Sequence, residues 1–339
     1  MMTDNTKRYY PHIDALKGIA IILMVIGHSL AWSYTDIGFL TKNISELTTN
    51  ELYASFVWKI IYSFHMPLLI CVSGYLFYKN TNYDSNFVKK QLNKRITRLL
   101  VPYIVTGVFV LFLKGYFGYW FLQILFLLNI IALLENYIVQ LFFNNKKYKW
   151  IVSHSIVFLG LFIFTKIILN YDLPKELNNL TNIHNYYLAF ILGTSLKQFP
   201  KLEEYLTSDK IKFVALLFFL AIFTLNLYGH FKILSIVGAA AIIINLWGVF
   251  KGCEFKYSFE KPIILIGKNS LEIYIFHLFF IISIKEVGDY ILSTSDFATN
   301  ITIQLIYSIV NTIIAILLSL ATSKIIKKNK YLSKLIFGV

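Results

Sequence analysis

Charged residues are scarce in this sequence of 339 residues, at 15% against roughly a quarter in soluble domains. Apolar residues account for 57%, and the mean hydropathy is +0.63. A soluble protein of this length could not bury so much apolar surface, so the lipid bilayer must be the solvent for most of the chain. The scarcity of charge excludes a soluble domain and indicates one membrane-embedded domain over residues 1–339.

Cysteine and arginine are also rare. Cys71 lies in an apolar run and Cys253 in a basic loop, which excludes a disulfide scaffold and a thiolate metal site, and no metal is expected. Only three of the 32 basic residues are arginines, namely Arg8, Arg95 and Arg98. In a chain so rich in lysine, we expect arginine where a planar guanidinium must make two parallel hydrogen bonds.

The net charge of +14 does not indicate nucleic acid as a partner. The basic residues stand in short clusters between apolar runs, which is the pattern of a membrane protein with positive loops on the inside. Membrane lipids are therefore the expected surroundings.

Ten apolar stretches are each long enough to span a bilayer, or nearly so. The sequence thus predicts an all-α polytopic membrane protein with about ten transmembrane helices. The first stretch lacks a cleavage site for a signal peptidase and is expected to be a retained helix. The stretches cover residues 13–33, 53–78, 96–114, 118–141, 150–170, 184–200, 211–229, 231–250, 262–284 and 300–324.

The loops between these stretches alternate in charge. Lysine and arginine fill every second loop, beginning with Lys7 and Arg8 and ending with residues 324–334, whereas acidic residues such as Asp36 and Glu51 occupy the others. This alternation predicts that both termini are cytoplasmic and that the number of helices is even. The expected location is the inner membrane of a bacterium.

The first helix carries a stripe of ionisable residues, Asp14, Lys17 and His28. Lys17 and His28 are about three turns apart, so they share one face at a separation of roughly 16 Å. Such a stripe suits a long donor with an anionic head and a reactive tail, with His28 as a general base. A neutral His28 bonded to a neighbouring helix fits periodicity equally well, and Asp14 fits a helix cap or a partner of Lys17.

Two further groups lie in the second and third helices. His65 stands near the middle of the second helix, and Pro67 beside it frees a backbone carbonyl, which indicates either a functional cavity or a kinked packing helix. Arg95 and Arg98, at the cytoplasmic end of the third helix, are three residues apart, so they share one face and would clamp a phosphate or pyrophosphate. Anchoring at the inner surface is the alternative.

The ninth helix contains Glu272, Tyr274 and His277. Glu272 and His277 are five residues apart and point to different sides, so each either lines a cavity or joins two helices by hydrogen bonds. Glu135, near the inner end of the fourth helix, is expected to extend its carboxylate to the surface. His154 lies near a helix end, and no chemical role is expected for it.

Together these residues resemble the acyltransferase family 3 membrane proteins, which include polysaccharide O-acetyltransferases and fucose 4-O-acetylase-like enzymes. Each matching segment alone is weak evidence for the family, but four such segments occur in order along nearly the whole chain. The matching segments are Asp14-Ala15-Leu16-Lys17-Gly18 with His28, Phe64-His65-Met66-Pro67 with Ser73-Gly74-Tyr75, Arg95-x-x-Arg98, and Ser270-Leu271-Glu272-Ile273-Tyr274 with His277.

The resemblance implies ten transmembrane helices, an acyl-CoA donor and an acceptor that is often a sugar hydroxyl. It makes His28 the catalytic histidine, which we expect to act with Asp14 and His65. Lys17, Arg95 and Arg98 fall on the donor side, and Glu272, Tyr274 and His277 are expected to bind the acceptor. The family more often has arginine where this chain has Lys17, so donor contacts there are expected to differ.

The predicted function is transfer of an acyl group, most simply acetyl, from acyl-CoA to a hydroxyl of a cell-surface or lipid-linked glycan. Acetyl-CoA is a co-substrate here, and no permanently bound cofactor is expected. An oligomer is compatible with the sequence. The alternative is a transporter or flippase for a lipid-linked oligosaccharide, in which the same charged residues contact the transported substrate.

Overall fold

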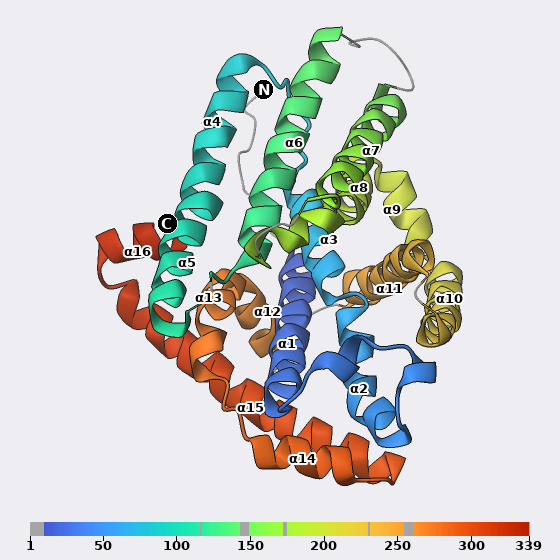
Figure 1. Cartoon of the computed structure of the whole chain (residues 1–339). Helices are drawn as coiled ribbons and strands as arrows, with labels where there is room; N and C mark the ends of the chain where they lie inside the picture. The colour runs from blue at the N-terminus through green and yellow to red at the C-terminus, as the bar shows by residue number, and fades with distance from the viewer. Residues whose placement is uncertain are drawn as a thin grey trace. The chain divides into compact units, whose positions relative to one another are not determined.

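The computed structural model describes residues 10–115, 117–142, 149–171, 175–229, 231–253 and 260–338. Every regular element within these ranges is helical, which confirms the all-α prediction (Figure 1). Some members of the predicted basic loops, among them Lys7, Arg8, Lys146, Lys147 and Lys256, lie outside the described residues.

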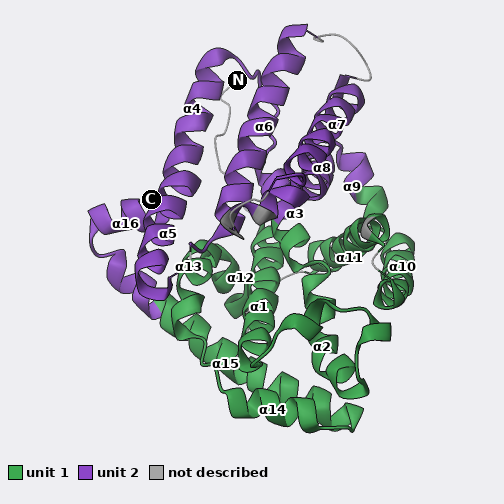
Figure 2. Ribbon diagram, in the orientation of Figure 1, with its two compact units in different colours: residues 1–69, 204–320 green, residues 70–203, 321–339 purple. Residues whose placement is uncertain are grey.

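The chain forms two compact units, shown in Figure 2. Unit 1 comprises residues 1–69 and 204–320, and unit 2 comprises residues 70–203 and 321–339. Unit 1 contains α1 (Pro11–Ser33), α2 (Thr49–Tyr62), α10 (Asp209–Tyr228), α11 (Lys232–Gly252), α12 (Glu260–Lys268), α13 (Ser270–Phe280) and α14 (Lys285–Ser293). Unit 2 contains α4 (Ser85–Arg95), α5 (Val101–Lys114), α6 (Trp120–Phe142), α7 (Lys149–Ile168), α8 (Ile183–Gln198) and α16 (Lys330–Phe337). Three helices run from one unit into the other: α3 (His65–Phe77), α9 (Pro200–Leu206) and α15 (Phe297–Ile326).

The described residues include eight helices long and apolar enough to cross a membrane. The count rises to nine if α12 and α13, which are bent by 88°, form one broken span. The one predicted stretch not counted among these spans, residues 184–200, corresponds to α8, whose 16 residues fall short of the roughly 20 that a straight span needs. A multi-pass membrane protein is confirmed, whereas the number ten and the sidedness of the termini stay predictions.

The second predicted span, counted above as one helix over Thr49–Phe77, contains a turn. It consists of α2 and α3, which are interrupted at residues 63–64. Pro67 is the third residue of α3, a position where the amide hydrogen has no partner within the helix and its loss costs little. The break therefore lies immediately before His65 rather than after Pro67.

The prediction of one continuous helix over residues 262–284 is wrong. The structure has two helices there, α12 and α13, which meet at Asn269 with an 88° bend. After α13 the chain is extended at residues 281–284. Side chains of α15 bind this exposed backbone. Asn311 accepts from the Ile282 amide at 3.0 Å and donates to its carbonyl at 2.7 Å. The Tyr307 hydroxyl also donates to the Ile282 carbonyl, at 2.7 Å.

Helix α1 contacts α2, α11, α12, α13 and α14 within unit 1. Two glycines allow α12 to approach the backbone of α1 closely. A Cβ on Gly18 would collide with the Ile263 carbonyl, and a Cβ on Gly267 would collide with the Asp14 carbonyl. At the other end of α1, the Lys285 ammonium donates to the carbonyls of Trp32 and Tyr34 at 2.9 and 2.6 Å. A cation at a helix C-terminus is favourable because the helix dipole is negative there.

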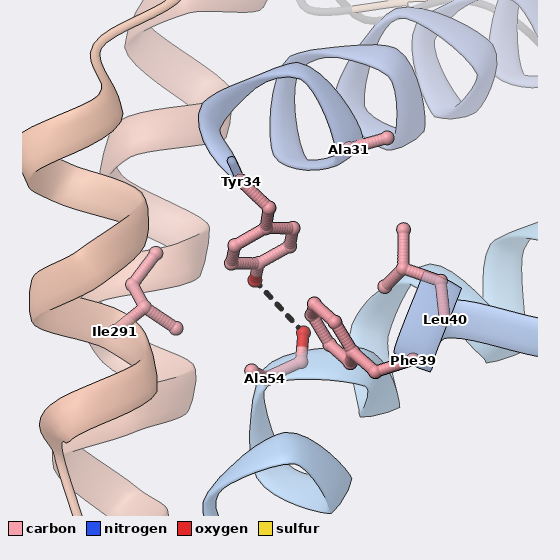
Figure 3. Close-up of a cluster of buried hydrophobic side chains, with 6 residues drawn as sticks. All are labelled: Ala31, Tyr34, Phe39, Leu40, Ala54 and Ile291. Atoms are coloured by element: carbon pink, nitrogen blue, oxygen red, sulfur yellow. Dashed lines mark hydrogen bonds between the residues drawn. The ribbon is translucent and has the colours of Figure 1, made fainter. Parts of the chain in front are cut away.

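The segment between α1 and α2 packs on a small apolar cluster, drawn in Figure 3. The Tyr34 hydroxyl donates to the Ala54 carbonyl at 2.9 Å, and the Tyr34 ring meets Phe39 edge-on. From α2, the Lys59 ammonium donates to the carbonyls of Leu40 and Lys42 at 2.8 and 2.7 Å. These contacts hold the segment in one conformation.

Unit 2 contains a buried polar group that the sequence interpretation missed. The Glu135 carboxylate is 5% exposed and does not reach the surface. One of its oxygens lies 2.6 Å from His154 Nδ1, and the other accepts from the Tyr187 hydroxyl at 2.6 Å. Glu135, His154 and Tyr187 therefore join α6, α7 and α8, because a buried carboxylate needs partners of this kind.

We expect Glu135→Ala to lower the free energy of unfolding by about 3–5 kcal/mol, because it leaves the buried partners of the carboxylate unsatisfied. Denaturation of the purified protein in mild detergent measures this change. Glu46→Ala is the control, since Glu46 is exposed, accepts a hydrogen bond from Asn43, and its loss should cost within about 0.5 kcal/mol. Equal stabilities for the two variants would contradict a structural role for Glu135.

Candidate active site

His28 lies near the C-terminal end of α1 and is partly exposed. Three aromatic rings surround it, with centroids at 5.3 Å (His277), 5.8 Å (Trp32) and 6.2 Å (Tyr62). Its Nδ1 is 3.4 Å from the Tyr62 hydroxyl. His28 thus stands where α1, α2 and α13 meet.

The break between α2 and α3 places Tyr62 and His65 together. Their ring centroids are 4.8 Å apart, and the Tyr62 ring is also stacked on Trp58 at 3.9 Å. His65 is 1% exposed, and its Nδ1 lies 2.9 Å from the Ile61 carbonyl. Because a carbonyl only accepts, Nδ1 carries the hydrogen and Nε2 keeps the lone pair in the neutral ring.

His277 is fixed in the same way from α13. It is 1% exposed, and its Nδ1 lies 3.1 Å from the Ile273 carbonyl, so Nδ1 again carries the hydrogen. Tyr274 is a ring neighbour at 6.0 Å. Glu272 is buried in the first turn of α13, where the positive end of the helix dipole favours a carboxylate.

Gly27 explains how Tyr62 can lie so close to α1. A Cβ at this position would stand 2.7 Å from Tyr62 Cε2, closer than real Cβ contacts. Gly27 therefore leaves the space that the Tyr62 ring occupies, directly beside the candidate catalytic residue His28. Among the residues that the structure describes, no group of three or more His, Cys, Asp and Glu side chains is arranged to hold a metal ion.

The Asp14–Lys17 pair lies at the opposite end of α1 from His28. Asp14 Oδ1 is 2.7 Å from Lys17 Nζ, and both side chains are partly exposed. Of the alternatives for Asp14, the partner of Lys17 is the one observed. Asp14 is 14 residues from His28, roughly 21 Å along a straight helix, so the two do not touch.

Arg95 and Arg98 belong to unit 2, where a π-helical turn over residues 96–100 follows α4. Three residues cover a smaller rotation in a π-helix than in an α-helix, and the shared face of the two arginines stays a prediction. The Arg95 guanidinium lies over the Phe77 ring at 5.8 Å, and its buried Nε makes no hydrogen bond to the described residues. Arg98 is exposed.

Of the predicted residues, the structure brings together His28, His65 and His277. It pairs Asp14 with Lys17, and it places Arg95 and Arg98 in the other compact unit. The sequence interpretation missed Tyr62, although it lies three residues before His65 and would share a helix face with it. It also missed the polar face of α15, which includes the buried Asn300, Gln304, Ser308 and Asn311.

Comparison with known proteins gives one family and one weak relative. Residues 10–320 match the model of an acyltransferase domain, acyltransferase family 3. The chain is also similar to the nodulation protein NolL of Sinorhizobium fredii, with 35% identity over 89 residues. That match covers 26% of this chain and 21% of the relative, so it spans only about a fifth of the relative's length. No solved structure matches the chain.

Gly27→Ala should displace the Tyr62 ring, because the added methyl group overpacks the contact, at a cost of about 1–3 kcal/mol in unfolding free energy. We also expect the near-UV circular dichroism of the stacked Trp58–Tyr62 pair to weaken. Gly160→Ala is the matched control: a Cβ there meets nothing within 4 Å, so alanine should stabilise the helix by up to about 1 kcal/mol. An unchanged spectrum and stability for Gly27→Ala would show that Tyr62 is not held against α1.

Proposed function

The chain belongs to acyltransferase family 3, and from this premise we propose that it moves an acetyl group from acetyl-CoA to a hydroxyl of a cell-surface or lipid-linked glycan. A membrane acyltransferase follows from the family and the apolar helices. The donor, the acetyl group, the glycan and the inner membrane of a bacterium are the proposed parts. Acetyl-CoA is consumed as a substrate and is not a resident cofactor.

One observation carries the proposal: a partly exposed His28 in a membrane helix, near two buried histidines whose Nδ1–H groups are bound by backbone carbonyls. Ionisable side chains are rare inside spanning segments and are kept there for function. A histidine is neutral and able to accept a proton near neutral pH. His28 is thus the group in the cluster best suited to act as a general base.

In the proposed reaction, His28 removes the proton of the acceptor hydroxyl as its oxygen attacks the thioester carbonyl. The new C–O bond forms first, and the C–S bond then breaks as the tetrahedral intermediate collapses. The imidazolium returns the proton to the departing thiolate, so the products are the O-acetyl ester and free CoA. If Nδ1 donates to the Tyr62 hydroxyl, Nε2 is the basic atom.

The other histidines have supporting roles in this scheme. His277, with its ring 5.3 Å from His28, is proposed to bind the acceptor together with Tyr274, and its Nε2 can accept from a sugar hydroxyl. His65 acts through Tyr62, which lies between it and His28. Glu272 is proposed to complete the acceptor side. Asp14 is proposed to act at a distance, by positioning Lys17.

Lys17, Arg95 and Arg98 are each proposed to bind phosphate oxygens of the donor. In unit 1, Lys17 would exchange its contact with Asp14 for a phosphate oxygen. In unit 2, the like charges of Arg95 and Arg98 act on each other, and a phosphate between them would relieve this repulsion. The buried Nε of Arg95 offers a donor for such an anion. The alternation of basic and acidic loops supports a cytoplasmic position for the phosphate head group of the donor.

His28→Gln should abolish acetyl transfer, because a positioned general base contributes about 10²–10⁴-fold. The assay follows label from acetyl-CoA into glycan with purified protein in lipid nanodiscs. His184→Gln, a change outside the cluster, is the control and should retain activity. A His28→Gln protein with normal expression and undiminished transfer would reject the assigned base. Movement of a lipid-linked glycan without consumption of acetyl-CoA would instead indicate a transporter.

A further inference from the structure

An open cavity lies in unit 1 beyond the C-terminal end of α1. Its volume is about 670 Å³, within the range of roughly 300–1,000 Å³ typical of small-molecule sites. The segment between α1 and α2, the first turn of α2, and Leu292 of α14 line it. The polar lining includes Thr35, Asp36, Thr48, Asn50 and Glu51.

The cavity is built from fixed side chains. Asp36 Oδ1 accepts from the Gly38 amide at 2.8 Å. Thr48 and Glu51 form a capping box at the start of α2, in which each side chain binds the backbone of the other residue. Phe39 belongs both to the lining of the cavity and to the apolar cluster of Figure 3. Little ordering is therefore needed when a ligand binds.

The chemistry of the lining selects a class of ligand. It offers hydroxyls, an amide and two carboxylates, and none of the lining residues is a lysine, arginine or histidine. Carboxylates accept strong hydrogen bonds from hydroxyl groups and repel anions. Phe39 and Leu292 supply apolar surface for the C–H groups of a sugar ring. A neutral sugar fits this lining, whereas a uronate or a phosphate does not.

The position of the cavity relates it to His28. Thr35 follows His28 by seven residues, and α1 is helical to Ser33, so the cavity begins on the order of 10 Å from the histidine along the helix. One sugar ring cannot reach across this distance and touch both. A ligand that occupies the cavity and also presents a hydroxyl to His28 must contain more than one sugar.

We infer that the cavity holds a neutral sugar residue of the acceptor at a distance from the residue that is acetylated, so that the acceptor is an oligosaccharide. This inference rests on the proposed function, because it assigns the reacting hydroxyl to His28. Asp36 and Glu51 bind sugar hydroxyls, and their negative charge disfavours acidic glycans.

The test uses the full chain in nanodiscs and saturation-transfer NMR with two kinds of probe. One is a set of neutral trisaccharides of glucose, mannose, galactose and N-acetylglucosamine, and the other is a trisaccharide of galacturonate. We expect at least one neutral trisaccharide to bind and the uronate not to bind. The Asp36→Asn/Glu51→Gln variant keeps the amide oxygens that the segment needs, yet its affinity for the neutral sugar should fall about tenfold.

Glu46→Gln is the matched control, because it removes a carboxylate from the same segment outside the cavity. Hydrolysis of acetyl-CoA without acceptor should be equal in all three proteins. Three results would overturn the inference. These are equal sugar binding by the double variant and the control, tight binding of the uronate, and no binding of any neutral trisaccharide. Loss of acetyl-CoA turnover in every protein, with sugar binding retained, would contradict the proposed function and not the sugar site.

Discussion

A polar group inside a bilayer must find its partner within the protein, and the arrangement of unit 1 depends on this constraint. A turn at residues 63–64 separates α2 from α3, and the chain is extended at residues 281–284. The second break is permitted because Asn311 and Tyr307 bind both polar backbone groups of Ile282. The break after α13 thus has dedicated hydrogen-bond partners on α15.

The consequence of these breaks is chemical. One lies directly before His65, and the other follows the short helix that carries His277, so both rings can gather near His28 on the unbroken α1. The carbonyls of Ile61 and Ile273 then fix the tautomers of the two buried rings. Backbone geometry thus determines which nitrogen atoms remain able to accept protons.

Much of this arrangement follows from sequence. Apolar run lengths predicted the spanning helices, and the ionisable residues within them identified His28, His65 and His277. Periodicity could not predict the 88° bend at Asn269, because no proline marks it and hydropathy continues across it. The buried Glu135 was misinterpreted, since its partners lie 19 and 52 residues further along the chain and only tertiary structure brings them together.

In the proposed reaction the donor reaches the protein from the cytoplasm, so the loop before the paired arginines must be cytoplasmic. Sided labelling tests this directly, with Cys253 replaced by serine and single cysteines introduced at Lys89 or Ser45, both of which are exposed. A membrane-impermeant maleimide should modify Ser45→Cys in intact cells and Lys89→Cys only after permeabilisation. Labelling of Lys89→Cys from outside intact cells would place the loop before the paired arginines on the wrong side, and the account would fail.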